Sequence, residues 1–190
     1  MKAKGDHLLA AFVVAFVAYA SVGSLLTSSG ASYWDVPLKT SIIFALYLLF
    51  PERSSLGWGR RAWILMLVVA LLLSVIWVFY SELRGRSVPD MAIDASVVYP
   101  LVNIAVVTPV FEEKMVRHLL FMAFSSWING VLAAILVSAL FALSHYNVFL
   151  WAFIASMALC WMFRKVGANS IQCALVHGVL NLVVILTYLL

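Results

Sequence analysis

Charged residues are scarce in this sequence. Asp, Glu, Lys and Arg make up 11% of its 190 residues, whereas soluble domains carry about 25%. Hydrophobic residues make up 65%, and the mean hydropathy is +1.08. This composition excludes an ordinary soluble domain and predicts an integral membrane protein.

Other features that would indicate a particular function are also missing. The net charge of +4 comes from scattered residues without a basic run, so we expect no nucleic-acid partner. Cys160 and Cys173 both lie in apolar segments, and neither a disulfide nor a cysteine zinc site is expected. The sequence has no H-E-x-x-H zinc motif and no internal repeat of the kind found in transporters.

Apolar runs predict an all-α transmembrane bundle that forms one domain over residues 1–190. Because a span needs about 20 apolar residues, the runs predict about seven spans. They cover residues 7–27, 37–50, 62–82, 95–124, 128–146, 148–164 and 169–190. Pro100 and Pro109 indicate bends in the long fourth run. We expect accessory spans in 1–94 and the core helices in 95–190.

Basic residues at the ends of the predicted spans indicate the orientation, because Lys and Arg favour the cytoplasmic side. One side collects Lys2, Lys4, Arg53, Arg60, Arg61, Arg164 and Lys165, and the other collects Lys39, Arg84 and Arg86. We therefore expect a cytoplasmic N-terminus and an outside C-terminus. The compact form of the chain indicates a prokaryotic inner or plasma membrane. The polar connection 83–94, which contains Asp90 and Asp94, is predicted to be a loop or interfacial segment.

Segment 111–117, Phe-Glu-Glu-Lys-Met-Val-Arg, places four ionisable groups in an otherwise apolar run. A charge at the centre of a bilayer costs at least about 2.5–3.5 kcal/mol, so such groups are candidates for function. Glu113 and Arg117 have the spacing of a helical ion pair, while Glu112 points about 100° away and stays available for chemistry. The alternative interpretation is a buried polar cluster that only holds helices together.

Pro109 precedes Glu112 by one helical turn. It removes a backbone donor and frees a carbonyl. Irregular backbone at membrane depth is tolerated mainly beside protein or a water-filled cavity. This predicts water near Glu112.

Two further segments carry polar side chains at helical spacing. Phe141 and His145 share one face, although a histidine near a span end is also typical of the membrane interface. His177 and Asn181 share another face, where such groups also serve as interhelical hydrogen-bonding partners worth about 0.6–2 kcal/mol each. Gly178 between them permits close approach of a neighbouring helix.

Together the three segments supply the groups needed to hydrolyse a peptide bond. A glutamate and a histidine can activate water as general bases, and a second histidine and an asparagine can stabilise an oxyanion. The same glutamate and two histidines can instead ligate zinc, which activates its bound water.

The order and spacing of these residues resemble the three motifs of a known family. The motifs are Glu112-Glu113-x-x-x-Arg117, Phe141-x-x-x-His145 and His177-x-x-x-Asn181, with a Gly167-x-x-Ser170 turn before the third. They resemble the CAAX protease and bacteriocin-processing (CPBP, or Abi) family, which includes the Ras-converting CAAX endopeptidase. The resemblance covers roughly residues 100–185.

The resemblance implies a glutamate-type intramembrane protease with a water-accessible cavity. It implies that Glu112 and His145 activate the attacking water, that His177 and Asn181 form the oxyanion hole, and that Glu113 and Arg117 support the site. No cofactor is expected by this mechanism. If zinc were used, its ligands would be Glu112, His145 and His177.

One position departs from the family pattern. Many members have glycine after the motif-one arginine, where this chain has His118. Lys114 and His118 share a helix face, and we predict that they and Phe141 lie at the entrance or contact substrate.

The expected partners are the lipid bilayer and a membrane-tethered protein or peptide substrate, lipidated or tail-anchored. Two alternatives stay open: a non-catalytic immunity or scaffold protein of the same fold, and a proton or ion translocator that uses Glu112, His145 and His177 as a relay.

Overall fold

The structure is a computed structural model that describes residues 2–84 and 98–189. All regular elements in these residues are helical, as the composition predicts. The long helices are α1 (Lys2–Ser28), α2 (Asp35–Leu49), α3 (Arg60–Arg84), α7 (Gly130–Ser144), α8 (Phe149–Trp161) and α9 (Ser170–Leu189). Arg86, Asp90 and Asp94 fall in 85–97, outside the described residues, so the predicted loop there stays a prediction.

The predicted fourth run forms one uninterrupted helical stretch from residue 98 to 127. It consists of α4 (Val98–Val102), a π-helical segment (Asn103–Val107), α5 (Thr108–Glu113), a second π-helical segment (Lys114–Phe121) and α6 (Met122–Trp127). Single π-helical turns often accompany functional sites. Here they flank the segment that carries Glu112 and Glu113.

Short helical turns complete the connections. Two 3₁₀ turns, Ser32–Trp34 and Tyr146–Val148, precede α2 and α8, and a π-helical segment, Met162–Val166, follows α8. That segment ends at Gly167, whose φ of 81° is left-handed and therefore suits glycine. Gly167 and Ser170 thus form the turn into α9 that the Gly-x-x-Ser pattern indicates.

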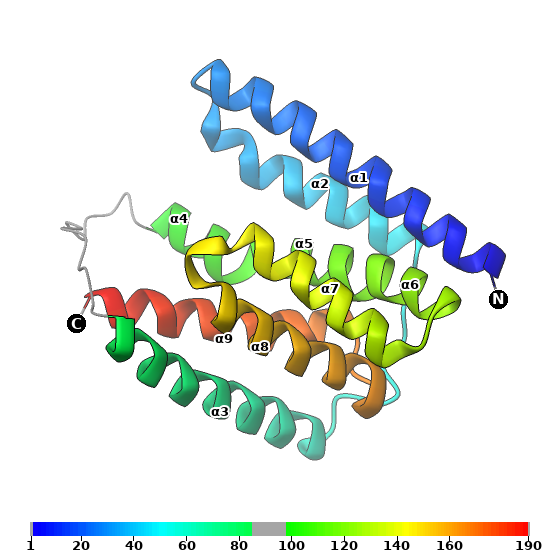
Figure 1. Ribbon diagram of the computed structural model, residues 1–190. Helices are drawn as coiled ribbons and strands as arrows, with labels where there is room; N and C mark the ends of the chain where they lie inside the picture. The colour runs from blue at the N-terminus through cyan, green and yellow to red at the C-terminus, as the bar shows by residue number, and fades with distance from the viewer. Residues whose placement is uncertain (1, 85–97, 190) are drawn as a thin grey trace.

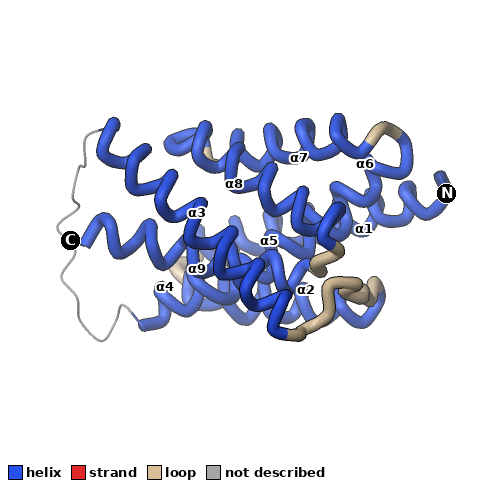
Figure 2. Tube along the Cα trace, turned by 90° about the horizontal axis from the view of Figure 1, so that it is seen from below, coloured by secondary structure: helices blue, strands red, loops and turns tan. Residues whose placement is uncertain are grey.

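Figures 1 and 2 show the helices running broadly along one direction. The α1–α2 hairpin covers one side of the bundle and α3 covers the opposite side, with α5 and α9 between them (Figure 1). α7 packs against α8, while both α3 and α5 pack against α9. The helix that carries Glu112 and the helix that carries His177 are therefore neighbours at the centre of the fold.

Four helices in the described residues are long and apolar enough to cross a membrane, judged by length and composition. They are Lys4–Ser28, Arg60–Arg84, Tyr146–Val166 and Ser170–Tyr188, and Gly130–Ser144 is a shorter apolar helix. The all-α bundle of an integral membrane protein is therefore confirmed. The number of crossings stays a prediction.

Two hydrophobic clusters fix the helices around the centre. One joins α3, α8 and α9 and includes Trp77, Trp151 and Leu180. The other joins α1 and α2 to the helix of motif one and includes Leu46 and Phe111. Cys160 and Cys173 are buried free thiols.

Candidate active site

Glu113 lies at the centre of a buried polar cluster. Its Oε2 pairs with Arg117 Nε at 2.9 Å, and both side chains have an exposed fraction of 0%. Its Oε1 lies 2.9 Å from His177 Nδ1 on α9. The ion pair expected from the four-residue spacing is therefore present, and it also holds the imidazole of the third motif.

Arg117 has a second stabilising contact. Its guanidinium carbon lies 5.3 Å from the centre of the Phe141 ring, a cation–π geometry. The Phe141 ring also meets His177 edge to face, with centroids 5.8 Å apart. Phe141 thus packs within the polar cluster and joins α7 to it.

Glu112 lies beside this cluster but outside its ion pair. Its Oε2 is 3.7 Å from His177 Nε2, and its side chain is 25% exposed. A neutral imidazole that donates from Nδ1 to Glu113 has an unprotonated Nε2. Nε2 and the Glu112 carboxylate are then both acceptors, and a water molecule that donates to each would join them.

Pro109 leaves a gap in the backbone hydrogen bonding of the helix that precedes Glu112. Thr108 donates its N–H to the carbonyl of Asn103, in the π-helical pattern. The next bond of that pattern would join residue 109 to the Ile104 carbonyl, but proline has no N–H. Asn181 Nδ2 donates to the Ile104 carbonyl instead, at 2.8 Å. The carbonyl expected to be freed by Pro109 is therefore paired with Asn181.

Gly178 allows this contact between the two helices. A Cβ atom at position 178 would clash with the carbonyl oxygen of Ala105. The predicted close approach is confirmed, and its partner is the π-helical segment before α5.

His145 ends α7 and has different partners. Its Nδ1 lies 2.9 Å from the carbonyl oxygen of Phe141 and 3.0 Å from Ser144 Oγ. Its ring lies against the Phe141 ring, with centroids 4.4 Å apart. Among the described residues, the histidine–carboxylate pairs involve His118 and His177 and not His145.

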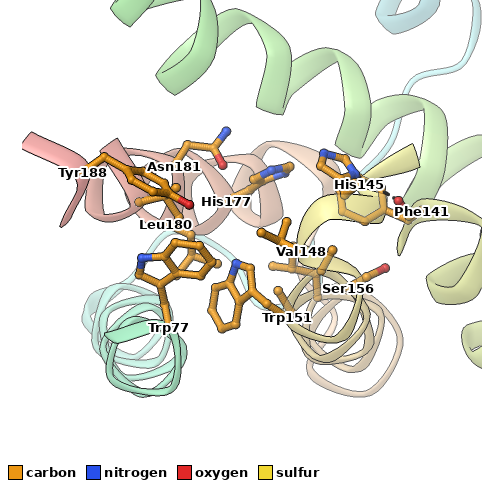
Figure 3. Close-up of a pocket in the computed structure, with 14 residues that line it drawn as sticks. Trp77, Phe141, His145, Val148, Trp151, Ser156, His177, Leu180, Asn181 and Tyr188 are labelled. Carbon is orange, nitrogen blue, oxygen red and sulfur yellow. Dashed lines mark hydrogen bonds between the residues drawn. The ribbon is translucent and has the colours of Figure 1, made fainter. Parts of the chain in front are cut away.

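A cavity of about 250 Å³ opens between α3, α7, α8 and α9. His145, His177 and Asn181 line it together with Trp77 and Trp151. Figure 3 shows the Trp77 and Trp151 rings on the side of the cavity opposite His177. Trp77 Nε1 donates to Thr187 Oγ1 at 2.8 Å, so its ring presents apolar surface. The bundle therefore contains a largely apolar cavity with motif side chains on one wall.

The proposed zinc ligands do not converge in this geometry. Within residues 2–84 and 98–189, no three His, Cys, Asp or Glu side chains lie close enough together to hold a metal ion. Glu112 and His177 are near each other, whereas His145 packs on Phe141.

Lys114 does not occupy the predicted place at an entrance. It has an exposed fraction of 0%, because its ammonium group turns inward to Glu52 Oε1 at 3.0 Å and to the Phe50 carbonyl at 2.6 Å. His118 lies beside the same carboxylate, with Nδ1 3.8 Å from Glu52 Oε1 and a side chain that is 13% exposed.

Sequence reasoning missed Glu52, Trp77 and Trp151. Glu52 follows Pro51 in a connection that reads as a loop, and the tryptophans read as ordinary span residues. A carboxylate next to the predicted end of a span was the one available signal for Glu52. Trp77 gave no signal, because its role arises from the packing of α3 against α9.

These features define a polytopic membrane protein with a Glu–His site buried in its helical bundle. A comparison with known families matches residues 94–183 to the Type II CAAX prenyl endopeptidase Rce1-like family. This match agrees with the resemblance carried by the three motifs. No curated protein and no solved structure gives a significant match to the chain.

Proposed function

We propose that the protein is an intramembrane endopeptidase that hydrolyses a peptide bond of a membrane-tethered protein or peptide. The observation that carries this proposal is the contact between helices of different motifs. Glu112 and Glu113 on α5 both face His177 on α9, and His177 opens onto the cavity. The match of residues 94–183 to the Type II CAAX prenyl endopeptidase Rce1-like family supports the same activity.

Glu112 is the proposed general base. A water molecule that donates to Glu112 Oε2 and His177 Nε2 would be polarised by two acceptors, with Glu113 fixing the imidazole orientation. When the water oxygen attacks the substrate carbonyl carbon, its proton passes to Glu112 and then to the departing amine nitrogen. This assignment gives His177 the share in water activation that the family resemblance gives to His145.

Asn181 and His145 line the same cavity and are the proposed partners of the substrate carbonyl and of the departing amine. One hydrogen of Asn181 Nδ2 is donated to Ile104, which leaves the second for an oxyanion. His145 Nδ1 lies 2.9 Å from the Phe141 carbonyl oxygen, so a neutral imidazole donates there and its Nε2 can accept a hydrogen bond from the departing amine, while Glu112 delivers the proton.

The cavity supports a substrate with a bulky apolar group near the cleaved bond. A cavity of about 150 Å³ accommodates benzene, so one of about 250 Å³ accommodates roughly ten non-hydrogen atoms. That size corresponds to a large side chain or to a short stretch of lipid. We also propose that the end of the bundle with Lys4, Arg53 and Arg164 faces the cytoplasm.

Reconstituted protein tests the proposal. A quenched fluorescent peptide that ends in an S-farnesyl CAAX box, the same peptide without the lipid, and a tail-anchored peptide serve as probes in liposomes. Cleavage of any one of them that disappears in Glu112→Gln is the expected result. A cellular phenotype that survives Glu112→Gln would favour a non-catalytic role, and proton flux blocked by that variant would favour a translocator.

A further inference from the structure

The loop between α2 and α3 is bonded to the start of α9. Leu56 N donates to the Gly167 carbonyl at 3.1 Å, and Ser54 Oγ donates to the same carbonyl at 3.0 Å. Ser54 Oγ also bonds Gln172 Oε1 at 2.6 Å. This loop precedes residues 94–183, so the contacts come from outside the segment that matches the protease family.

Glu52 in this loop bonds two helices at once. Its Oε1 pairs with Lys114 Nζ at 3.0 Å, and its Oε2 accepts from the backbone N–H of Ser170 at 2.9 Å. It also contacts the Ser170 hydroxyl. The exposed fraction is 7% for the Glu52 side chain and 0% for Lys114. Tyr47 covers Lys114, whose Nζ lies 4.0 Å from the ring centroid.

The two bonded positions lie on the helical segments that carry the proposed site. Lys114 directly follows Glu113 in the chain. Ser170 is the first residue of α9, and His177 lies seven residues further, about two turns along the same helix. A carboxylate at a helix N-terminus caps a free N–H and complements the helix dipole. Glu52 therefore ties the end of α5 to the start of α9.

We infer that Glu52 is a positioning residue that sets the placement of α9 relative to α5, and thereby of His177 relative to Glu112 and Glu113. It touches none of the proposed reacting atoms. The catalytic consequence rests on the proposed protease function, whereas the placement of His177 against Glu113 does not.

A purely stabilising role would have different consequences. Removing one partner of a buried ion pair leaves an unpaired charge, whereas removing both charges is often neutral. Glu52→Gln with Lys114→Met removes both charges, and the Gln oxygen still caps Ser170. If Glu52 only stabilised the fold, this double variant would recover both stability and activity. If Glu52 is a positioning residue, the double variant recovers stability but not activity, because the link between α5 and α9 is lost.

The experiment compares Glu52→Gln, Lys114→Met, the double variant and Arg53→Gln in liposomes. Arg53 is the exposed neighbour of Glu52 and serves as the matched control. We expect the double variant to unfold at the wild-type temperature while kcat falls about tenfold to a hundredfold, with KM unchanged. Arg53→Gln keeps the wild-type kcat. Glu52→Asp, which keeps a carboxylate at this position, has a higher kcat than Glu52→Gln.

A second readout is independent of cleavage. NMR of ¹⁵N-labelled histidine reports the Nδ1–H proton of His177, which the Glu113 carboxylate shifts downfield. We expect this resonance to move or broaden in the double variant and to stay in Arg53→Gln. An unchanged resonance together with wild-type kcat in the double variant overturns the inference. If the wild type cleaves no probe but the resonance is displaced in the double variant, the proposed function is overturned and the positioning role stands.

Discussion

His177 Nδ1 lies 2.9 Å from Oε1 of Glu113, the second glutamate of motif one. This contact joins the first and third motifs directly, although the two residues are 64 positions apart. It separates the two adjacent glutamates by role. Glu113 is committed to Arg117 and His177 in the interior, whereas Glu112 keeps a partly exposed carboxylate beside Nε2 of the same imidazole.

The carboxamide variants of the two glutamates should therefore differ. Glu113→Gln leaves the Arg117 charge buried without its partner, and we expect a loss of about 3–5 kcal/mol in stability together with loss of cleavage. Glu112→Gln should unfold at the wild-type temperature yet lose at least about a hundredfold in kcat. Thermal unfolding in detergent and peptide cleavage measure the two effects. Equal destabilisation by both variants would contradict the separation of roles.

Asn181→Ala should reveal the pairing with the backbone. It leaves the Ile104 carbonyl without its donor, for an expected cost of about 1–3 kcal/mol, and it lowers kcat about 10²–10³-fold if the amide binds an oxyanion. Pro109→Ala restores a backbone N–H beside that carbonyl. The Pro109→Ala, Asn181→Ala double variant should thus regain stability without activity. Recovery of both would show that Asn181 serves only as a helix partner.

Gly178→Ala should separate the helices that carry the site. The added Cβ meets the Ala105 carbonyl, which is backbone and cannot rotate away, so we expect a loss of about 1–3 kcal/mol. Cleavage should fall in parallel as His177 is displaced. Gly23→Ala is the control, because a Cβ there meets no atom within 4 Å. If Gly178→Ala and Gly23→Ala unfold at the same temperature, the result would argue against close helix contact at Gly178.

Trp77→Ala should enlarge the cavity opposite His177. Trp77 is 2% exposed and packs on Trp151 with ring centroids 5.6 Å apart. We expect a loss of about 3–5 kcal/mol and a shift of preference towards peptides with larger apolar groups, measured as kcat/KM over a graded series. Trp63→Ala, on the same helix but 53% exposed, should leave the preference unchanged. An unchanged preference in Trp77→Ala would show that the cavity does not receive that group.

Metal removal tests the remaining mechanistic alternative. We expect cleavage to continue after dialysis against a strong zinc chelator, because the proposed base is the Glu112 carboxylate itself. Metal content before and after dialysis, measured by mass spectrometry, confirms the removal. Loss of cleavage that returns on addition of zinc would favour metal-activated water instead.

Much of the fold could be predicted from the sequence, because membrane spans are encoded locally. Each apolar run coincides with a helical stretch in the described residues, and the run 95–124 corresponds to helix 98–127. The ion pair between Glu113 and Arg117 was likewise predictable, since the two residues are four positions apart on one helix and therefore share a face. Pro109 and Gly178 also carried local signals that the backbone contacts confirm.

The contacts between helices could not be read in the same way. Sequence spacing indicates which side chains share a face but not which face meets which neighbour. The association of His177 with Glu113, the packing of His145 on Phe141 and the burial of Lys114 against Glu52 all depend on helix placement. Lys114 is an example. Its charge suggested an exposed position, but its ammonium group is buried against the carboxylate of Glu52, which is distant in the sequence.

The sequence by itself determined that the chain forms apolar helices with ionisable groups in three motifs, because hydrophobic length and helical spacing act within a single segment. Only the tertiary structure decided that Glu113 orients His177, that Glu52 joins two core helices and that Trp77 lines the cavity. These relationships arise when helices pack, since a buried charge or ring acquires its partner only from the surface placed against it.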